Sequence, residues 1–422
     1  MNRLVPRVAV HSFYECPCTQ VTGIFYSRIV ADSLSRKIEL TEIAPGAEGV
    51  ATAFHALRDS LETGQIFAPI PKLSRHYSQH QIDSIVAAIN PDEPLQADTI
   101  AILTTSGSTG NPRGVELRAS QLGALNNHVN SGAVIGIYVD APARWICALP
   151  VTSIGGVNVL SRSIAAETVP VGLESVAGGA TFDPHEFATA VSRIGDEPIF
   201  VSLVSTQLRR LMNSQEGTKA LSRCTAILVG GGPTPTNDFL QAQDLELPLS
   251  YTYGMTETSG GCVFSGKNGP RTEIVCDSTD SRITVRGPSV AEGYRPTHTS
   301  KFISFNGEFR TEDYGSVDSL GHLEILGRLD DIVLVNGVNI SRAAISRVIE
   351  KYTEIDSCYV LPNLTALVVA DPAVFENTSA SIRSQISREL GSVAIPVFRV
   401  VPTLPRLPNG KLDRVTITNL YG

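Results

Sequence analysis

The chain has 422 residues, enough for two or three domains with a sizeable core. Its 34 Lys and Arg against 42 Asp and Glu give a formal net charge of −8, which argues against nonspecific binding to nucleic acid. No run of about 18 apolar residues is present, so we expect no membrane span. Pro6 and Arg7 interrupt the start of the chain, so we expect no secretory signal and a cytoplasmic location.

Residues 1–95 mix helical patterns with turns, and from about residue 98 onward strand-like and helix-like patterns alternate. Apolar residues at positions 82, 85, 86 and 89 have helical spacing and predict a helix over 79–90 that stops at Pro91. Further along, strands are predicted at 99–106, 198–205 and 225–232, and helices at 121–129, 207–212 and 237–243. This alternation predicts an α/β fold with parallel-rich sheets flanked by helices.

The pattern changes near residue 305. Two strand-like pieces, 314–318 and 322–327, flank a short turn and predict an antiparallel hairpin. After Asp330 and Asp331 come a strand, a turn, a helix, two strands, a helix around 379–390 and a last strand. We therefore predict a large N-terminal domain over 1–329 and a small α+β domain over 330–422.

The segment 103–115, LTTSGSTGNPRGV, follows a predicted strand and gathers Thr, Ser and Gly before a cationic residue, Arg113. Such a loop can direct hydroxyl and backbone N–H groups at one anion, because its glycines let the backbone approach closely. It is not a Walker A loop, since no Gly-Lys-Ser/Thr follows at the required spacing. A solvated surface loop is the alternative.

Four further motifs lie at 253–257 (YGMTE), 309–313 (FRTED), 327–331 (GRLDD) and 408–414 (PNGKLDR). Together with the loop at 103–115, they resemble in order the signature of the adenylate-forming superfamily of acyl-CoA synthetases, peptide-synthetase adenylation domains and luciferases. Two positions depart from it: Arg113 stands where Lys is usual, and Glu312 where Gly is usual. Compared with that superfamily, the N-terminal lobe is abbreviated.

Three other runs, at 149–163, 202–208 and 258–264, are similar to the o-succinylbenzoate–CoA ligases of menaquinone biosynthesis, although Thr152 and Ser153 replace histidines common there. The resemblance implies an ATP-dependent ligase that forms an acyl-adenylate and then a CoA thioester, releasing AMP and pyrophosphate. The alternatives are a ligase for another aryl or acyl acid, transfer to a carrier protein, and a non-catalytic adenylate-binding protein.

The resemblance also implies residue roles. Lys411 would bridge the substrate carboxylate and the α-phosphate, Thr256 would contact that phosphate, and Glu257 would help to hold Mg²⁺. The β- and γ-phosphates would lie on the loop, with Thr105, Ser106, Gly107, Ser108, Thr109, Gly110 and Arg113. The rest of the nucleotide would lie on Gly231, Gly232, Tyr253 and Gly254 (adenine) and on Asp313 and Arg328 (ribose). For the glycines, a tight strand exit is the alternative.

Arg162 is the candidate partner for a nonreacting carboxylate of the acid, which a guanidinium can bind at two points; a surface salt bridge is the alternative. Further candidates for the acyl pocket are Gln207, Ser259, Gly260 and Gly261. By resemblance, Gly337 lines the path of the CoA pantetheine arm, and Asp330 is the hinge of a mobile small domain. The expected cofactors and co-substrates are ATP, Mg²⁺ and CoA. Small molecules are the expected partners, and a homodimer stays an open alternative.

Overall fold

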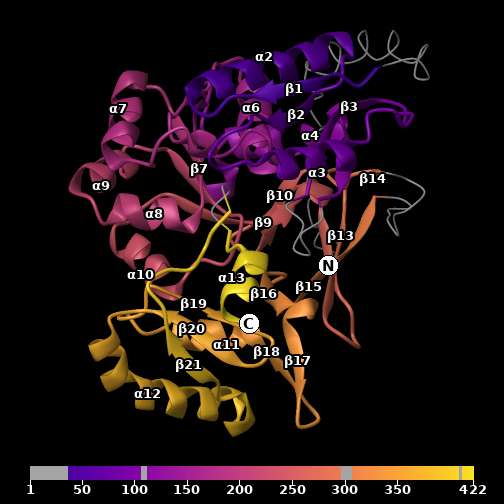
Figure 1. Cartoon of the computed structure of the whole chain (residues 1–422). Coiled ribbons are helices and arrows are strands. Elements are labelled where there is room, and N and C mark those ends of the chain that lie inside the picture. Colours follow the sequence, from indigo (N-terminus) through magenta and orange to yellow (C-terminus); the bar gives the residue numbers. More distant parts are fainter. Residues whose placement is uncertain (1–36, 106–111, 296–306, 408–410) are drawn as a thin grey trace, which may run out of the picture.

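The computed structural model describes residues 37–105, 112–295, 307–407 and 411–422 (Figure 1). Several predicted site residues lie outside these ranges, namely Ser106, Gly107, Ser108, Thr109 and Gly110 of the phosphate loop. Within the described ranges, no helix combines the length and the apolar character needed to cross a membrane.

A seven-stranded sheet with the order β11-β10-β9-β8-β7-β5-β6 forms the centre of the fold. Its strands are β5 (Arg144–Cys147), β6 (Val171–Gly172), β7 (Ile199–Leu203), β8 (Ala226–Val229), β9 (Leu249–Met255), β10 (Gly260–Phe264) and β11 (Lys267–Asn268). Strands β6, β5, β7, β8 and β9 run parallel, and β10 and β11 continue the sheet antiparallel. Every residue of β7 and β8 is buried, as expected where both faces of a sheet are covered.

The strands of this sheet are connected by the helices α6 (Ile154–Ala165), α7 (Pro184–Ile194), α8 (Ser205–Met212), α9 (Gln215–Leu221) and α10 (Thr236–Asp244) and by the short turns η2 (Val176–Gly178) and η3 (Thr256–Thr258). A further turn, η1 (Ala133–Ile135), precedes β5. The predicted α/β alternation is therefore confirmed here. The predicted helix over 121–129 is wrong as one element: α4 (Ala119–Leu122) and α5 (Asn126–Asn130) replace it. Gly123 ends the first helix, and Leu125 leaves the helical region with φ −115°.

The N-terminal lobe contains the parallel pair β1 (Leu40–Ile43) and β2 (Ala68–Pro71), with helices α2 (Ala47–Thr63) and α3 (Gln79–Ile89). Helix α3 confirms the prediction: Ser78 and Gln81 form a capping box, and Asn90 ends the helix in the left-handed region. Strand β3 (Thr99–Thr104) differs from expectation, since it pairs antiparallel with β4 (Gly114–Arg118), which in turn pairs with β14 (Gly293–Arg295). The Ser/Thr/Gly loop therefore joins two paired strands.

The predicted hairpin after residue 305 is present as β15 (Glu308–Val317) and β16 (Leu323–Arg328). It belongs to an antiparallel sheet that also contains β12 (Glu273–Cys276) and β13 (Arg282–Arg286). The turn η4 (Leu329–Asp331) leads from this sheet into the C-terminal part.

The C-terminal part contains two small sheets and three helices among its described residues. Its elements are β17 (Ile332–Val335), β18 (Val338–Ser341), α11 (Arg342–Ile349), β19 (Ser357–Val360), β20 (Thr365–Val369), α12 (Pro372–Leu390), η5 (Ser392–Ala394), β21 (Val397–Val400) and α13 (Arg414–Tyr421). Helix α12 starts earlier than predicted because Asp371 caps it and Pro372 fits its first turn. The buried hydrophobic clusters of this part contain no residue before 333, and the largest cluster of the remainder ends at Leu323.

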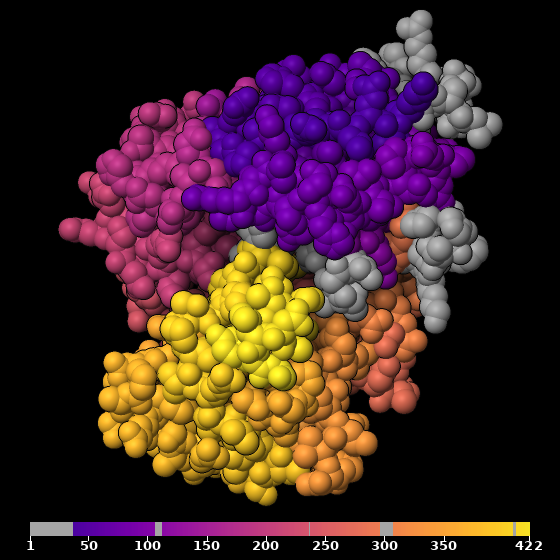
Figure 2. Space-filling model, in the orientation of Figure 1, coloured from indigo at the N-terminus to yellow at the C-terminus, as the bar shows by residue number. Residues whose placement is uncertain are grey.

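The two parts touch through arginines that reach backbone carbonyls. Arg209 on α8 donates from Nη1 to the carbonyl of Asp356 at 2.7 Å. Arg347 on α11 donates to the carbonyls of Ile325 and Leu326 at 3.2 and 2.7 Å. Figure 2 shows the C-terminal part, in orange and yellow, packed against the rest of the molecule.

Glu350, which ends α11 at this contact, supplies a prediction about pH. Burial raises its pKa from the ordinary 4.5 to about 7, although Arg209 and Arg406 oppose the shift; Asp238 adds to it. Because the folded pKa is the higher one, the contribution of this carboxyl to the free energy of unfolding is full below about pH 4.5 and is lost as the pH rises through about 7. In urea denaturation, that free energy should fall more steeply from about pH 5 to 7 in the wild type than in Glu350→Gln. Equal slopes would contradict the assignment.

Candidate active site

A cavity of about 2330 Å³ is lined by residues of both parts. Most predicted site residues that the structure describes line it: Thr105, Arg113, Arg162, Gly231, Gly232, Tyr253, Gly254, Thr256, Glu257, Gly260, Gly261, Asp313, Arg328 and Lys411. Four do not: Gln207, Ser259, Asp330 and Gly337. Residues far apart in the sequence thus meet at one cavity.

The carboxyl end of β9 brings Thr256 and Glu257 to this cavity, the edge of a parallel sheet where ligands usually bind. Gly254 lets β10 approach closely, because a Cβ there would lie 1.9 Å from the carbonyl oxygen of Gly260. The Glu257 side chain is 8% exposed, and its Oε1 accepts a hydrogen bond from the hydroxyl of Tyr294. A carboxylate is therefore held at the strand end.

Arg113 lies beside that carboxylate, with Nη2 3.9 Å from Oε1 of Glu257 and its guanidinium 4.1 Å from the ring centre of Tyr294. The hydrogen bonds between Arg113 and Thr105, at 2.8 and 3.1 Å, close the base of the phosphate loop. Sequence reasoning missed Tyr294. In the sequence it is a single tyrosine between Gly293 and Arg295, outside the five motifs, so nothing there distinguishes it from an ordinary structural residue.

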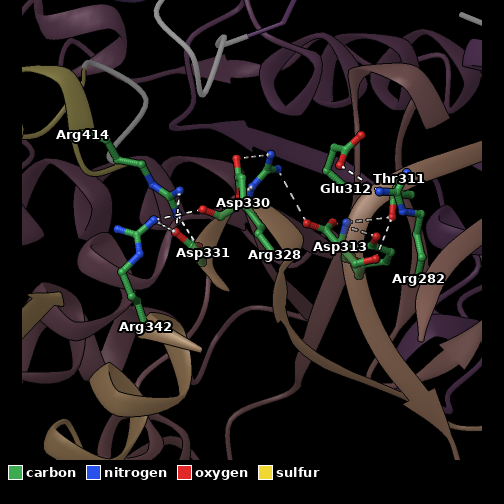
Figure 3. A network of polar contacts seen from close by, with 10 residues as sticks. Arg282, Thr311, Glu312, Asp313, Arg328, Asp330, Asp331, Arg342 and Arg414 are labelled. Carbon is green, nitrogen blue, oxygen red and sulfur yellow. Dashed lines mark hydrogen bonds and ion pairs between the residues drawn. The ribbon is translucent and has the colours of Figure 1, made fainter. Parts of the chain in front are cut away.

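Asp313 and Arg328, the predicted ribose contacts, belong to a charged network that extends to the start of the C-terminal part (Figure 3). Asp313 accepts a hydrogen bond from the Tyr253 hydroxyl at 2.8 Å and lies 3.6 Å from Nη1 of Arg328. Burial raises the pKa of Asp313, although Tyr253 and Arg328 oppose the shift. Arg328 also donates to both oxygens of Asp330, at 2.8 and 3.0 Å. Glu312, the residue that stands where Gly is usual, forms an ion pair with Arg282, with 3.4 Å between Oε2 and Nη2.

The segment that carries Lys411 is anchored by Asp331. This buried carboxylate lies 3.0 Å from both Arg342 and Arg414, which fixes the first residue of α13 (Figure 3). Loss of hydration lowers the pKa of Lys411 below its ordinary 10.5, while the charges of Glu257 and Asp313 oppose that shift. Lys411 is therefore close enough to both carboxylates for their charges to act on it.

Gly231 and Gly232 follow β8, and their backbone is open to the cavity. Gly231 has a φ of +85°, and a Cβ on Gly232 would meet no atom within 4 Å. A flat base could lie against this backbone. The stacking of Tyr253 on that base stays a prediction.

Arg162 is buried on α6 and is 5% exposed. Its guanidinium lies 5.3 Å from the ring centre of Trp145, and its Nε has no hydrogen-bond partner among the described residues. No carboxylate of the described ranges pairs with it. Burial lowers the pKa of the Arg162 guanidinium to about 10, so the group stays charged at neutral pH. A buried cation without an anionic partner is costly, so this site fits an acidic ligand.

Gln207 and Ser259 do not line the large cavity and instead form contacts within the fold. Gln207 donates to the Ala148 carbonyl at 2.9 Å and accepts from the Val204 N–H at 3.0 Å, beside a second cavity of about 470 Å³. Ser259 is buried in the left-handed region, with its carbonyl bonded to Asn158. Gly337, with φ +81°, forms the turn between β17 and β18.

The side chains that line the cavity suit a Mg²⁺ ion whose ligands are mainly phosphate oxygens of the substrate. No group of three His, Cys, Asp or Glu side chains that could hold a metal ion occurs in the described ranges. Mg²⁺ typically takes one or two protein carboxylates together with substrate phosphates and water. Glu257 suits that role, since it is a single buried carboxylate at the edge of the cavity.

Comparisons with known proteins agree with this geometry. The family model described as AMP-binding enzyme matches residues 35–295. A probable 2-succinylbenzoate–CoA ligase of Mycobacterium tuberculosis is 31% identical over 364 residues, covering 83% of this chain and 91% of that protein. The o-succinylbenzoate–CoA synthetase of Bacillus subtilis, solved with its acyl-adenylate intermediate, is 22% identical, with a TM-score of 0.66 over 92% of this chain and 89% of that one. The structure of the same synthetase with ATP and a magnesium ion is 21% identical, with a TM-score of 0.65 over 91% of this chain and 90% of that one. The chain therefore belongs to the AMP-binding enzyme family.

Proposed function

We propose that this protein is an AMP-forming acid–CoA ligase whose acid is 2-succinylbenzoate. The observation that carries the choice of acid is Arg162, a buried guanidinium in the cavity with no carboxylate partner among the described residues. The names of the relatives support the same acid. This acid has two carboxylates, so one can react while the other needs a cationic partner.

The first half-reaction joins the reacting carboxylate to the α-phosphate of ATP. A carboxylate oxygen forms a bond to phosphorus, the bond from phosphorus to the bridging oxygen breaks, and pyrophosphate leaves with that oxygen. Two anions must approach each other, so catalysis requires cations placed where charge concentrates. Lys411 lines the cavity, and the charges of Glu257 and Asp313 act on it, so it is the candidate that would bridge the two reactants.

The second half-reaction transfers the acyl group to CoA. The thiol sulfur forms a bond to the acyl carbon and gives up its proton to solvent, while the bond from that carbon to the AMP oxygen breaks and AMP leaves with that oxygen. Thr256 would hold the α-phosphate during both steps, and Asp313 with Arg328 would hold the ribose. Magnesium, when bound at Glu257, supplies positive charge to the phosphates.

A panel of acids tests this proposal. Pyrophosphate release would be measured with 2-succinylbenzoate, with two analogues that each lack one of its carboxylates, and with benzoate and a fatty acid, with and without CoA. We expect 2-succinylbenzoate to give the highest kcat/KM and CoA to be required for sustained turnover. Faster turnover of another acid would assign the ligase to that acid, and no release with any acid would favour a non-catalytic nucleotide-binding protein.

Arg162→Ala should raise the KM for 2-succinylbenzoate about thirtyfold and leave the KM for ATP unchanged. A lost charge-assisted contact with a partly buried carboxylate costs on the order of 2 kcal/mol, which corresponds to that factor. Steady-state kinetics of pyrophosphate release would measure both constants.

The analogue that retains the reacting carboxylate but lacks the other is the matched control for this variant. With it, Arg162→Ala and the wild type should have similar KM values, because the contact no longer exists in either. An unchanged KM for 2-succinylbenzoate itself would remove Arg162 from the acid site.

A further inference from the structure

Tyr294 touches both charged groups that the proposed chemistry places near the phosphates. Its hydroxyl donates to Oε1 of Glu257, and the guanidinium of Arg113 lies over its ring at 4.1 Å from the centre, within the range of a cation–π contact. Arg113 itself is 3.9 Å from the same oxygen of Glu257. One side chain thus links a carboxylate and a cation that come from different sheets.

The direction of the hydrogen bond follows from the chemistry of the pair. An ionised carboxylate has no proton to donate, so the phenol hydroxyl donates and Glu257 accepts. In the described ranges, no donor forms a hydrogen bond with Oε2 of Glu257. The tyrosine therefore occupies one oxygen of the carboxylate and leaves the other for a ligand.

The strand that carries Tyr294 is anchored on both sides of it. Alternation along β14 puts the side chains of Tyr294 and Arg295 on opposite faces. Arg295, 1% exposed, donates to Glu116 at 2.6 Å and to the carbonyls of Ile89 and Asn90, each at 2.8 Å, at the end of α3.

On the other side of Tyr294, Glu292 accepts from Gln121 at 3.1 Å and lies 3.2 Å from Arg118. The backbone pairing of β14 with β4 completes this frame. Glu292 and Arg295, which lie on either side of Tyr294 in the sequence, are thus tied to β4 or to the helices beside it. The hydroxyl of Tyr294 is therefore held at a fixed place relative to the base of the phosphate loop.

We propose that Tyr294 is a positioning residue for the magnesium and phosphate site, an inference that rests on the proposed function. Its hydroxyl fixes Glu257 so that one carboxylate oxygen stays available to Mg²⁺, and its ring keeps Arg113 beside the loop. Without the hydroxyl, Oε1 of Glu257 loses its hydrogen-bond donor, and the carboxylate pairs more closely with Arg113. Arg113 then competes with Mg²⁺ for this carboxylate.

Binding of ATP at a series of Mg²⁺ concentrations, measured by calorimetry without any acid, tests this role. Tyr294→Phe keeps the ring and loses the hydroxyl, whereas Tyr294→Leu loses both contacts. For Tyr294→Phe we expect the Mg²⁺ concentration for half-maximal ATP binding to rise roughly tenfold, with metal-free ATP binding unchanged. For Tyr294→Leu we expect metal-free ATP binding to weaken as well.

Two comparisons separate positioning from packing. Tyr251→Phe removes another buried hydroxyl lining the same cavity, one without a partner among the described residues, and should behave like the wild type. In a Glu257→Gln background, Tyr294→Phe should add no further Mg²⁺ requirement. The proposal is overturned if Tyr294→Phe lowers the melting temperature but leaves the Mg²⁺ requirement unchanged. The ATP-binding experiment contains no acid. Its result can therefore be interpreted even if the acid panel contradicts the proposed ligase activity.

Discussion

Lys411→Ala is expected to reduce acyl-adenylate formation by about a hundredfold or more, while the reaction of a supplied acyl-adenylate with CoA stays close to the wild-type rate. The reason is that the ammonium group is needed where carboxylate and phosphate approach each other, and that approach occurs only in the first half-reaction. Lys411 lines the cavity, and the charges of Glu257 and Asp313 act on it. Single-turnover assays of the two half-reactions measure the difference.

Lys351 offers a matched control for that variant. It belongs to the same C-terminal part, pairs with Glu389 at 2.9 Å and does not line the cavity, so Lys351→Ala should leave both half-reactions unchanged. Equal loss of both half-reactions in Lys411→Ala would contradict the assignment of the lysine to adenylation.

Asp330→Pro is expected to spare acyl-adenylate formation and to block the thioester-forming step. We propose that the C-terminal part rotates between the two steps, because Lys411 and the turn at Gly337 both lie in this part but only Lys411 lines the cavity here. Asp330 lies in η4, where this part begins, and a hinge must absorb a large change of φ and ψ that proline prevents. Gly337 would then border the path of the CoA arm after rotation.

Rotation would also break the hydrogen bonds that Arg209 and Arg347 form between the two parts. The control for Asp330→Pro is Asp330→Ala, which removes the ion pair with Arg328 but keeps backbone freedom. It should retain thioester formation. If Asp330→Pro turns over normally in both half-reactions, the hinge is elsewhere.

The sequence predicts features that depend on neighbouring residues. Helix α3 has its capping box and its stop within thirteen residues, and the β15–β16 hairpin has its turn between the strands. Pairing between distant segments is not encoded in this way. Strand β4 was not expected beside β3, and the break in the helix over 121–129 depends on the non-helical backbone at Leu125.

The candidate site shows the same limit. Its motifs pointed to Glu257, Asp313 and Lys411, which all line the cavity, because the spacing of such motifs is a property of the chain itself. Tyr294 lies 37 residues from Glu257, and only the fold brings the two together. Likewise, the sequence could not distinguish Arg162 as a surface residue from Arg162 as a buried one, since this depends on what covers α6.

The central claim is that this chain converts 2-succinylbenzoate, ATP and CoA into a thioester, AMP and pyrophosphate. The most direct test incubates the purified protein with all three substrates and Mg²⁺ and identifies the products by mass spectrometry. We predict equal amounts of AMP and of 2-succinylbenzoyl-CoA, neither of which forms when the acid is omitted. Formation of ADP and phosphate in their place, or the absence of any CoA thioester, would contradict the account.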